Sequence, residues 1–208
     1  MTEVELAARV VEMLSLDHDV YQEVTTPAGV ADIVASRGPV LWAIEVKKSL
    51  SLQVLGQALE NAVYFNFVSV AVPSRGNRGK AGPAARTLLR DHGIGLILVG
   101  QYASEDQRAR FNRGAGTKWV RLFEEQRTYA KAGNAEGARY TPFRGTRDAL
   151  VSHVQRFPGC TVREAMTSIK HHYHTLSTAM SCARNYIQTG VIKEIRLEDG
   201  KLYPGVQA

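Results

Sequence analysis

The chain has 208 residues, which is enough for one large domain or for two small ones with separate hydrophobic cores. Apolar residues make up 44% and charged residues 22%, a composition that excludes disordered and collagen-like chains. The formal net charge of +6 favours a polyanionic partner, but charge alone carries no specificity. Two cysteines are too few for a disulfide framework or a four-cysteine zinc site.

The N-terminal sequence lacks the pattern of a targeting segment. Acidic residues stand at its start, and no basic stretch precedes an apolar one. No apolar run approaches the roughly 20 residues that a membrane span needs. We therefore expect a cytoplasmic protein with no membrane partner.

The first elements are a helix and a set of strands. Apolar residues at helical spacing predict a helix over residues 3–16. Three β-type runs follow at 19–25, 29–35 and 39–48, and a turn-rich Ser-Arg-Gly-Pro separates the last two. Together these runs predict an antiparallel meander.

A second helix is predicted within residues 49–66, where serines that can cap a helix come first. Its expected sheet-facing side carries Leu52, Leu55, Leu59 and Val63. The next elements are a strand at 67–73, a helix at 83–93 and a continuously apolar strand at 94–100. This β-α-β order predicts an α/β fold with a mixed central sheet flanked by helices.

The apolar rhythm fades between residues 112 and 145, where Gly, polar and basic residues predominate. We therefore predict a boundary between two domains in this region. The expected parts are a first domain at 1–127, a linker at 128–145 and a second domain at 146–208.

The second domain contains three helical patterns and a hairpin pattern. Two β-type runs in residues 191–204 surround an Asp-Gly turn. Three helices followed by a hairpin are the element order of a small α+β winged helix-turn-helix domain. The helical patterns cover residues 146–157, 161–173 and 177–190.

The candidate chemistry lies on two strands of the meander. Because successive side chains of a strand alternate between faces, Glu45 and Lys47 point the same way, while Ile44 and Val46 point to the buried side. If the turn folds the two strands together, Asp32 comes beside Glu45. Two carboxylates near a lysine suit phosphodiester hydrolysis, since acidic oxygens hold Mg²⁺ and the ammonium neutralises charge on phosphate.

A Glu-x-Lys pattern on a strand is more often a solvated ion pair, and short motifs give many false positives. The position of Asp32 argues for a functional role. It lies in an otherwise apolar strand, where a carboxylate without a metal or another partner is costly.

Asp32, Glu45 and Lys47, with a helix, a meander and a helix around them, resemble the signature of the PD-(D/E)XK phosphodiesterase superfamily. This superfamily includes restriction enzymes, junction resolvases and Mrr-like nucleases. The resemblance covers about the first half of the chain, and one departure is Ala31, which stands where the pattern has proline. It implies a restriction endonuclease-like core, a Mg²⁺ or Mn²⁺ site at Asp32 and Glu45, and a catalytic Lys47.

The resemblance implies two further site residues. Several relatives carry a catalytic glutamine on the helix after the lysine strand, and Gln57 occupies a similar place, with Gln53 one turn earlier as a competitor. Relatives often add a glutamate from the first helix as a metal or water ligand. We choose Glu5 for this role over Glu3 and Glu12.

A basic loop after the strand at 67–73 carries Arg75, Arg78 and Lys80, which we expect to contact the DNA backbone. The loop is not a P-loop. Its glycine spacing is wrong, and no Ser or Thr follows Lys80.

In the second domain, the helical pattern at 177–190 is the candidate recognition helix. Arg184, Asn185 and Gln188 are its expected contacts to base edges or phosphates, and Lys170 just before it adds a phosphate contact.

We therefore expect a metal-dependent DNA endonuclease that a winged helix positions on DNA. Two alternatives stay open. The first is a non-catalytic winged-helix DNA-binding regulator, in which the nuclease-like core is only a scaffold. The second is a structure-selective or recombination nuclease subunit that is active only in a larger nucleoprotein complex. Since cutting both strands generally needs two active sites, symmetry favours a homodimer.

Overall fold

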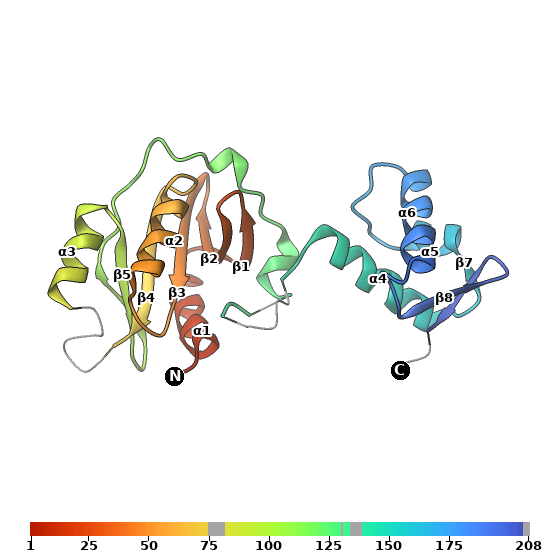
Figure 1. Cartoon of the computed structure of the whole chain (residues 1–208), viewed down its shortest axis with the longest axis horizontal. Coiled ribbons are helices and arrows are strands. Elements are labelled where there is room, and N and C mark those ends of the chain that lie inside the picture. The colour runs from red at the N-terminus through yellow and green to blue at the C-terminus, as the bar shows by residue number, and fades with distance from the viewer. Residues whose placement is uncertain (75–81, 130, 134–138, 206–208) are drawn as a thin grey trace. The chain divides into compact units, whose positions relative to one another are not determined.

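The structure is a computed structural model that describes residues 1–74, 82–129, 131–133 and 139–205. It divides into two compact units, Met1–Tyr140 and Thr141–Ala208, which are drawn in Figure 1. The division lies inside the linker that we predicted at 128–145. Both ends of that predicted linker are structured, because residues 142–145 belong to a helix of the second unit and Ala132 is fully buried in the first.

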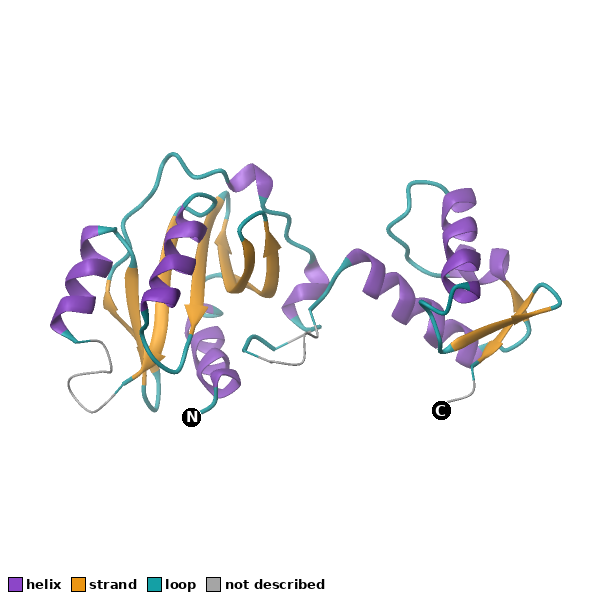
Figure 2. Ribbon diagram, in the orientation of Figure 1, coloured by secondary structure: helices purple, strands orange, loops and turns teal. Residues whose placement is uncertain are grey.

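The first unit is built on a six-stranded mixed sheet (Figure 2), which confirms the predicted α/β class. Strands pair antiparallel at β1–β2, β2–β3 and β5–β6, and parallel at β3–β4 and β4–β5. The strands follow the sheet in chain order: β1 (Asp19–Thr26), β2 (Gly29–Arg37), β3 (Val40–Val46), β4 (Phe67–Pro73), β5 (Gly95–Val99) and β6 (Ala103–Gln107). The polar sequence of β6 gave no strand signal, and its three central residues are exposed.

Helices cover both faces of this sheet (Figure 1). On one face, α1 (Glu3–Leu14) packs Leu6 and Val10 against Ile33 and Ile44. On the other face, α2 (Leu52–Ala62) and α3 (Pro83–Asp91) pack against a second apolar cluster that includes Val70. Two short 3₁₀ helices follow the sheet, η2 (Thr117–Trp119) and η3 (Glu124–Arg127).

The predicted inner face of α2 is wrong at Leu52, Leu59 and Val63, whereas Leu55 packs against the apolar cluster as expected. The Ser51 side chain caps the helix as expected, but Leu52 is 80% exposed and Val63 is 58% exposed. The buried positions are Val54, Ala58 and Asn61. The face of α2 that packs on the sheet thus includes Asn61, whose side-chain amide donates a hydrogen bond to the buried carboxylate of Glu45 on β3. Leu52 and Val63 lie on the side of the helix that faces solvent.

The second unit is a small α+β domain with a three-stranded antiparallel sheet in the order β7-β9-β8. Asp199 and Gly200 both have positive φ, which is typical of the tight turn of a β-hairpin. Its second helix ends at Ser168, earlier than predicted. The elements are α4 (Pro142–Arg156), β7 (Cys160–Thr161), α5 (Val162–Ser168), α6 (Leu176–Gln188), β8 (Ile195–Glu198) and β9 (Lys201–Pro204).

None of the helices in the described ranges is long and apolar enough to cross a membrane.

Candidate active site

The structure brings Asp32, Glu45 and Lys47 together. Asp32 Oδ2 accepts hydrogen bonds from Lys47 Nζ at 2.8 Å and from the amide of Val46 at 2.8 Å. Lys47 Nζ also lies 3.5 Å from Glu45 Oε2. The two carboxylates therefore share one ammonium group, as alternation along β3 and the β2–β3 hairpin predict.

The local backbone explains this convergence. The pairing of β2 with β3 stops at Ile33 and Ile44, so the next residue of each strand is Asp32 and Glu45. Beyond that point the amide of Val46 donates to the Asp32 side chain, and the amide of Lys47 donates to the Ala71 carbonyl of β4. Asp32 thus replaces a missing backbone acceptor and is fixed in position by β3 itself.

Glu45 is the most enclosed member of the cluster. Only 2% of it is exposed, and Asn61 Nδ2 of α2 donates a hydrogen bond to its Oε1 at 2.7 Å. Burial and then the negative charge of Asp32 raise the pKa of Glu45 to about 7, against an opposing effect of Lys47. Near neutral pH this carboxyl group is therefore poised between its two protonation states.

Lys47 stays protonated in this setting. Burial lowers its pKa, but the charges of Asp32 and Glu45 outweigh that effect, and the net shift of the pKa is upward. Its side chain is 24% exposed and that of Asp32 is 13% exposed, so the cluster opens to solvent on the side of these two residues.

The sequence analysis missed two polar residues of the cluster. Asn61 is the first, and its signal was an amide on the same helical face as two small apolar residues, Val54 and Ala58. Glu23 on β1 is the second. Burial and the charge of Asp32 both raise the pKa of Glu23, which shows that it lies in the field of the same cluster.

Glu23 has an unusual backbone, with φ of 54°. It is the residue skipped between the pairs Gln22–Ile33 and Val24–Ala31, and Asp32 is the residue skipped on β2. Its Oε1 accepts a hydrogen bond from the amide of Gly133 at 3.2 Å. A positive φ in a strand is strained for a residue other than glycine, and strain of this kind concentrates at functional sites.

The structure places Glu5 away from the cluster. It belongs to a capping box with Thr2, whose amide hydrogen bond to the carboxylate lowers the pKa of this exposed side chain. Glu3 is the residue of α1 that reaches the site. Its Oε1 accepts a hydrogen bond from the Lys48 amide at 3.4 Å, and its charge contributes to raising the pKa of Lys47.

Gln57 lies one helical turn before Asn61 on α2 and is half-buried, whereas Gln53 is exposed. Its Oε1 is buried and has no hydrogen-bond partner within the part of the chain that the structure describes. An unsatisfied buried acceptor is costly and calls for a ligand or a water molecule.

The expected DNA contacts divide into two groups. Arg75, Arg78 and Lys80 lie outside the described residues. In the second unit Arg184, Asn185 and Gln188 are all exposed on α6, and Lys170 is exposed between α5 and α6. The spacing of the three α6 residues puts them on one side of that helix.

The donors at the cluster fit a hard divalent cation. Within the described ranges no three His, Cys, Asp or Glu side chains form a preassembled metal site, and the donors that do converge are the two carboxylates Asp32 and Glu45. Mg²⁺ commonly binds through one or two carboxylates and keeps several water ligands, so two are sufficient. Two carboxylates against one ammonium leave an excess of negative charge, which suits a divalent ion.

None of the models of known protein families matches the chain, and no curated protein is significantly similar to it in sequence.

Proposed function

We propose that the chain is a metal-dependent DNA endonuclease with a restriction endonuclease-like core of the PD-(D/E)XK type. One observation carries the proposal: a carboxylate that is 2% exposed and a second carboxylate on the adjacent strand both contact the ammonium of Lys47. A structural ion pair needs one carboxylate for one lysine. A second buried carboxylate adds a desolvation cost that folding does not require, so a ligand with positive charge explains it better.

In this proposal Asp32 and Glu45 hold Mg²⁺ or Mn²⁺. When bound, the cation supplies Lewis-acid polarisation of a phosphate oxygen. Lys47 donates a hydrogen bond to the attacking water or to a phosphate oxygen on which charge develops. Asn61 keeps the Glu45 carboxylate in one orientation through its 2.7 Å hydrogen bond. Gln57, with its unsatisfied Oε1, is placed to accept a hydrogen bond from water at the same helix face.

In this proposal the second unit binds DNA. We interpret the three helices and the antiparallel hairpin as a winged helix, with α6 as its recognition helix. The exposed Arg184, Asn185 and Gln188 include one cation and two amides, which contact phosphates and base edges in such domains. The net charge of +6 supports the same kind of partner.

The test is cleavage of supercoiled plasmid, and of flap and junction DNA, with Mg²⁺ or Mn²⁺ and with EDTA. We expect metal-dependent nicking by the wild-type chain and its loss in Asp32→Asn and Lys47→Met. Glu60→Gln, which changes an exposed carboxylate of α2, is the matched control and should cut normally. Equal nicking by Asp32→Asn, or no cleavage of any DNA with either metal, would refute the proposal.

A second candidate is a DNA-binding protein that does not cut. The polar face of α6 favours it, because this face needs no catalytic core to bind DNA. In that case wild-type chain and Asp32→Asn would bind DNA equally in a gel-shift assay, and neither would cut. A nuclease subunit active only in a complex would instead cut branched DNA after a partner protein is added.

A further inference from the structure

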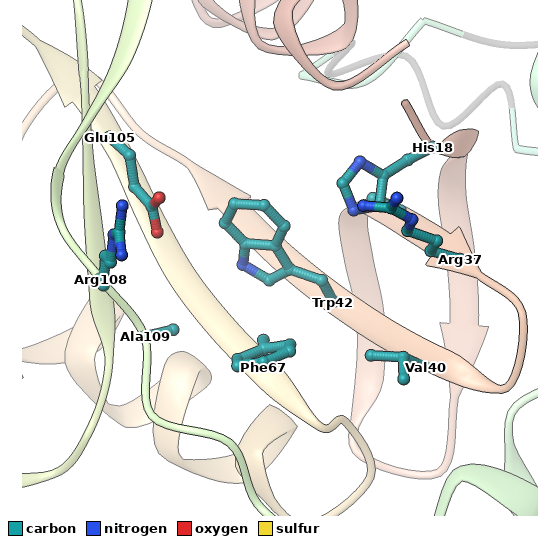
Figure 3. Close-up of a pocket in the computed structure, with 9 residues that line it drawn as sticks. His18, Arg37, Val40, Trp42, Phe67, Glu105, Arg108 and Ala109 are labelled. Carbon is teal, nitrogen blue, oxygen red and sulfur yellow. The ribbon is translucent and has the colours of Figure 1, made fainter. Parts of the chain in front are cut away.

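A pocket of about 410 Å³ lies on the α1 face of the sheet (Figure 3). Its volume falls in the range of about 300–1,000 Å³ that is typical of small-molecule sites. Ala35, Trp42 and Phe67 line it, and they are register partners on β2, β3 and β4. Glu45 lies three residues beyond Trp42 on β3, on the opposite face, so this pocket is separate from the carboxylate cluster.

Aromatic rings form the centre of the pocket. Trp42 Nε1 donates a hydrogen bond to Ser69 Oγ at 2.9 Å, which holds the indole in one orientation. His18 and Phe67 contact it edge-on, with ring centroids 6.0 Å and 6.4 Å from that of Trp42. A fixed indole between two other rings is a preorganised surface on which a planar aromatic ligand can stack.

Charged groups flank the aromatic centre on two sides. Figure 3 shows Arg37 on one side of Trp42, with Arg108 and Glu105 on the other. The partner of Arg37 is Asp17 at 3.6 Å, and both side chains are more than half exposed, so this ion pair is weak in water. Guanidinium groups bind phosphate through paired N–H donors, and a carboxylate accepts from the N–H groups of a base.

We propose that this pocket binds a nucleoside phosphate, with its base stacked on Trp42, its phosphate held by Arg37 on one side and the N–H groups of its base directed to Glu105 on the other. A purely apolar ligand would use neither the guanidinium group of Arg37, whose ion pair with Asp17 is weak, nor the carboxylate of Glu105. The nucleoside phosphate is either a free mononucleotide or an unpaired nucleotide of a DNA strand. Binding at this site does not depend on cleavage, because it uses none of the carboxylate cluster.

Tryptophan fluorescence measures binding at this pocket directly. The chain has two tryptophans, and Trp119 is 64% exposed and outside the pocket lining. The parent protein is therefore full-length Trp119→Phe, in which Trp42 is the single reporter. It is titrated in EDTA with AMP, GMP, adenosine, inorganic phosphate, a single-stranded oligonucleotide and a fully paired duplex.

We expect AMP or GMP, or the single-stranded oligonucleotide, to change Trp42 fluorescence in a saturable way. Adenosine should bind about tenfold more weakly than AMP, and Arg37→Ala should weaken binding of AMP by a similar factor. Arg90→Ala, an exposed arginine of α3 on the other face of the sheet, is the matched control and should bind like the parent.

The ligands separate the two sources of the nucleotide. Equal affinity for mononucleotide and single strand indicates a free nucleotide, and preference for the single strand over both mononucleotide and duplex indicates an unpaired nucleotide of DNA. No saturable change with any nucleotide, adenosine binding as tightly as AMP, or the same loss in Arg90→Ala would overturn the proposal. The titration is done in EDTA and measures binding without cleavage. A negative result in it therefore refutes nucleotide binding in this pocket and leaves the proposed nuclease activity to the cleavage assay.

Discussion

Replacing Glu45 by Gln should stabilise the metal-free protein at alkaline pH. The pKa of Glu45 is about 7 in the fold and 4.5 ordinarily, so folding favours the protonated form. Protonated Glu45 therefore contributes its full stability to the fold below pH 4.5. This contribution to the free energy of unfolding is lost as the pH rises from 4.5 to about 7, and it is absent at higher pH. Each factor of ten in the protonation equilibrium corresponds to about 1.4 kcal/mol, which gives a loss of roughly 3 kcal/mol at pH 8.

Glu45→Gln removes this loss because the amide is neutral at every pH, and it retains Oε1 as the acceptor for Asn61. We expect the variant to be more stable than the wild-type chain by about 3 kcal/mol at pH 8, and about equal to it at pH 4. With a urea dependence of about 1–3 kcal/mol per M, the unfolding midpoint should rise by about 1 M or more.

The assay is urea unfolding in EDTA, followed by tryptophan fluorescence. Both tryptophans, Trp42 and Trp119, belong to the first unit, so the signal reports on that unit alone. Glu60→Gln is the control and should leave the midpoint unchanged. A Glu45→Gln midpoint below that of the wild type at pH 8 would refute the reasoning, since attraction between Lys47 and Glu45 would then outweigh the cost of burial.

Three further predictions concern other parts of the chain. Asn61→Leu should lower the free energy of unfolding by about 1–3 kcal/mol in the same urea assay, because it leaves Glu45 Oε1 buried without its donor; an unchanged midpoint would contradict this. Gly133→Ala should destabilise the first unit more than Gly38→Ala does. Both glycines have positive φ, but a Cβ at residue 133 would lie 2.7 Å from the backbone of Glu3, whereas a Cβ at residue 38 would have no atom within 4 Å. Equal unfolding midpoints of the two variants would contradict a close approach of Gly133 to Glu3. Arg184→Ala should weaken DNA binding and, in gel shifts at several salt concentrations, reduce the salt dependence, and an unaltered affinity would remove α6 from the DNA interface.

Local sequence rules were sufficient to predict that Asp32, Glu45 and Lys47 lie together. Alternation along β3 places Glu45 and Lys47 on one side, and a short turn between two β-type runs brings Asp32 to them. These relations depend on neighbours in sequence or across one hairpin, where strand geometry leaves few alternatives.

Residues that depend on long-range packing were not predictable in the same way. The apolar spacing of Leu52, Leu59 and Val63 pointed to the wrong face of α2. The face that packs on the sheet also carries Asn61, whose hydrogen bond to Glu45 joins residues 16 positions apart in the chain. Glu23 required the register of the β1–β2 hairpin, which its own sequence does not give.

Residues 131–133 are a related case. Their composition suggested a linker, yet Ala132 is fully buried against the α1 side of the sheet. Its amide donates to the Gln22 side chain, and the amide of Gly133 donates to Glu23. Glycine and polar residues are common in linkers and in tightly packed turns, so composition does not separate the two.

The central claim is that Asp32 and Glu45 hold a divalent metal, and Mn²⁺ binding measured by electron paramagnetic resonance tests it most directly. At pH 8 we expect saturable Mn²⁺ binding to the wild-type chain and to Glu60→Gln. We expect Asp32→Asn and Glu45→Gln, each confirmed as folded by circular dichroism, to lose it. Undiminished Mn²⁺ binding in both variants, or no binding to the wild-type chain with or without DNA, would contradict the account.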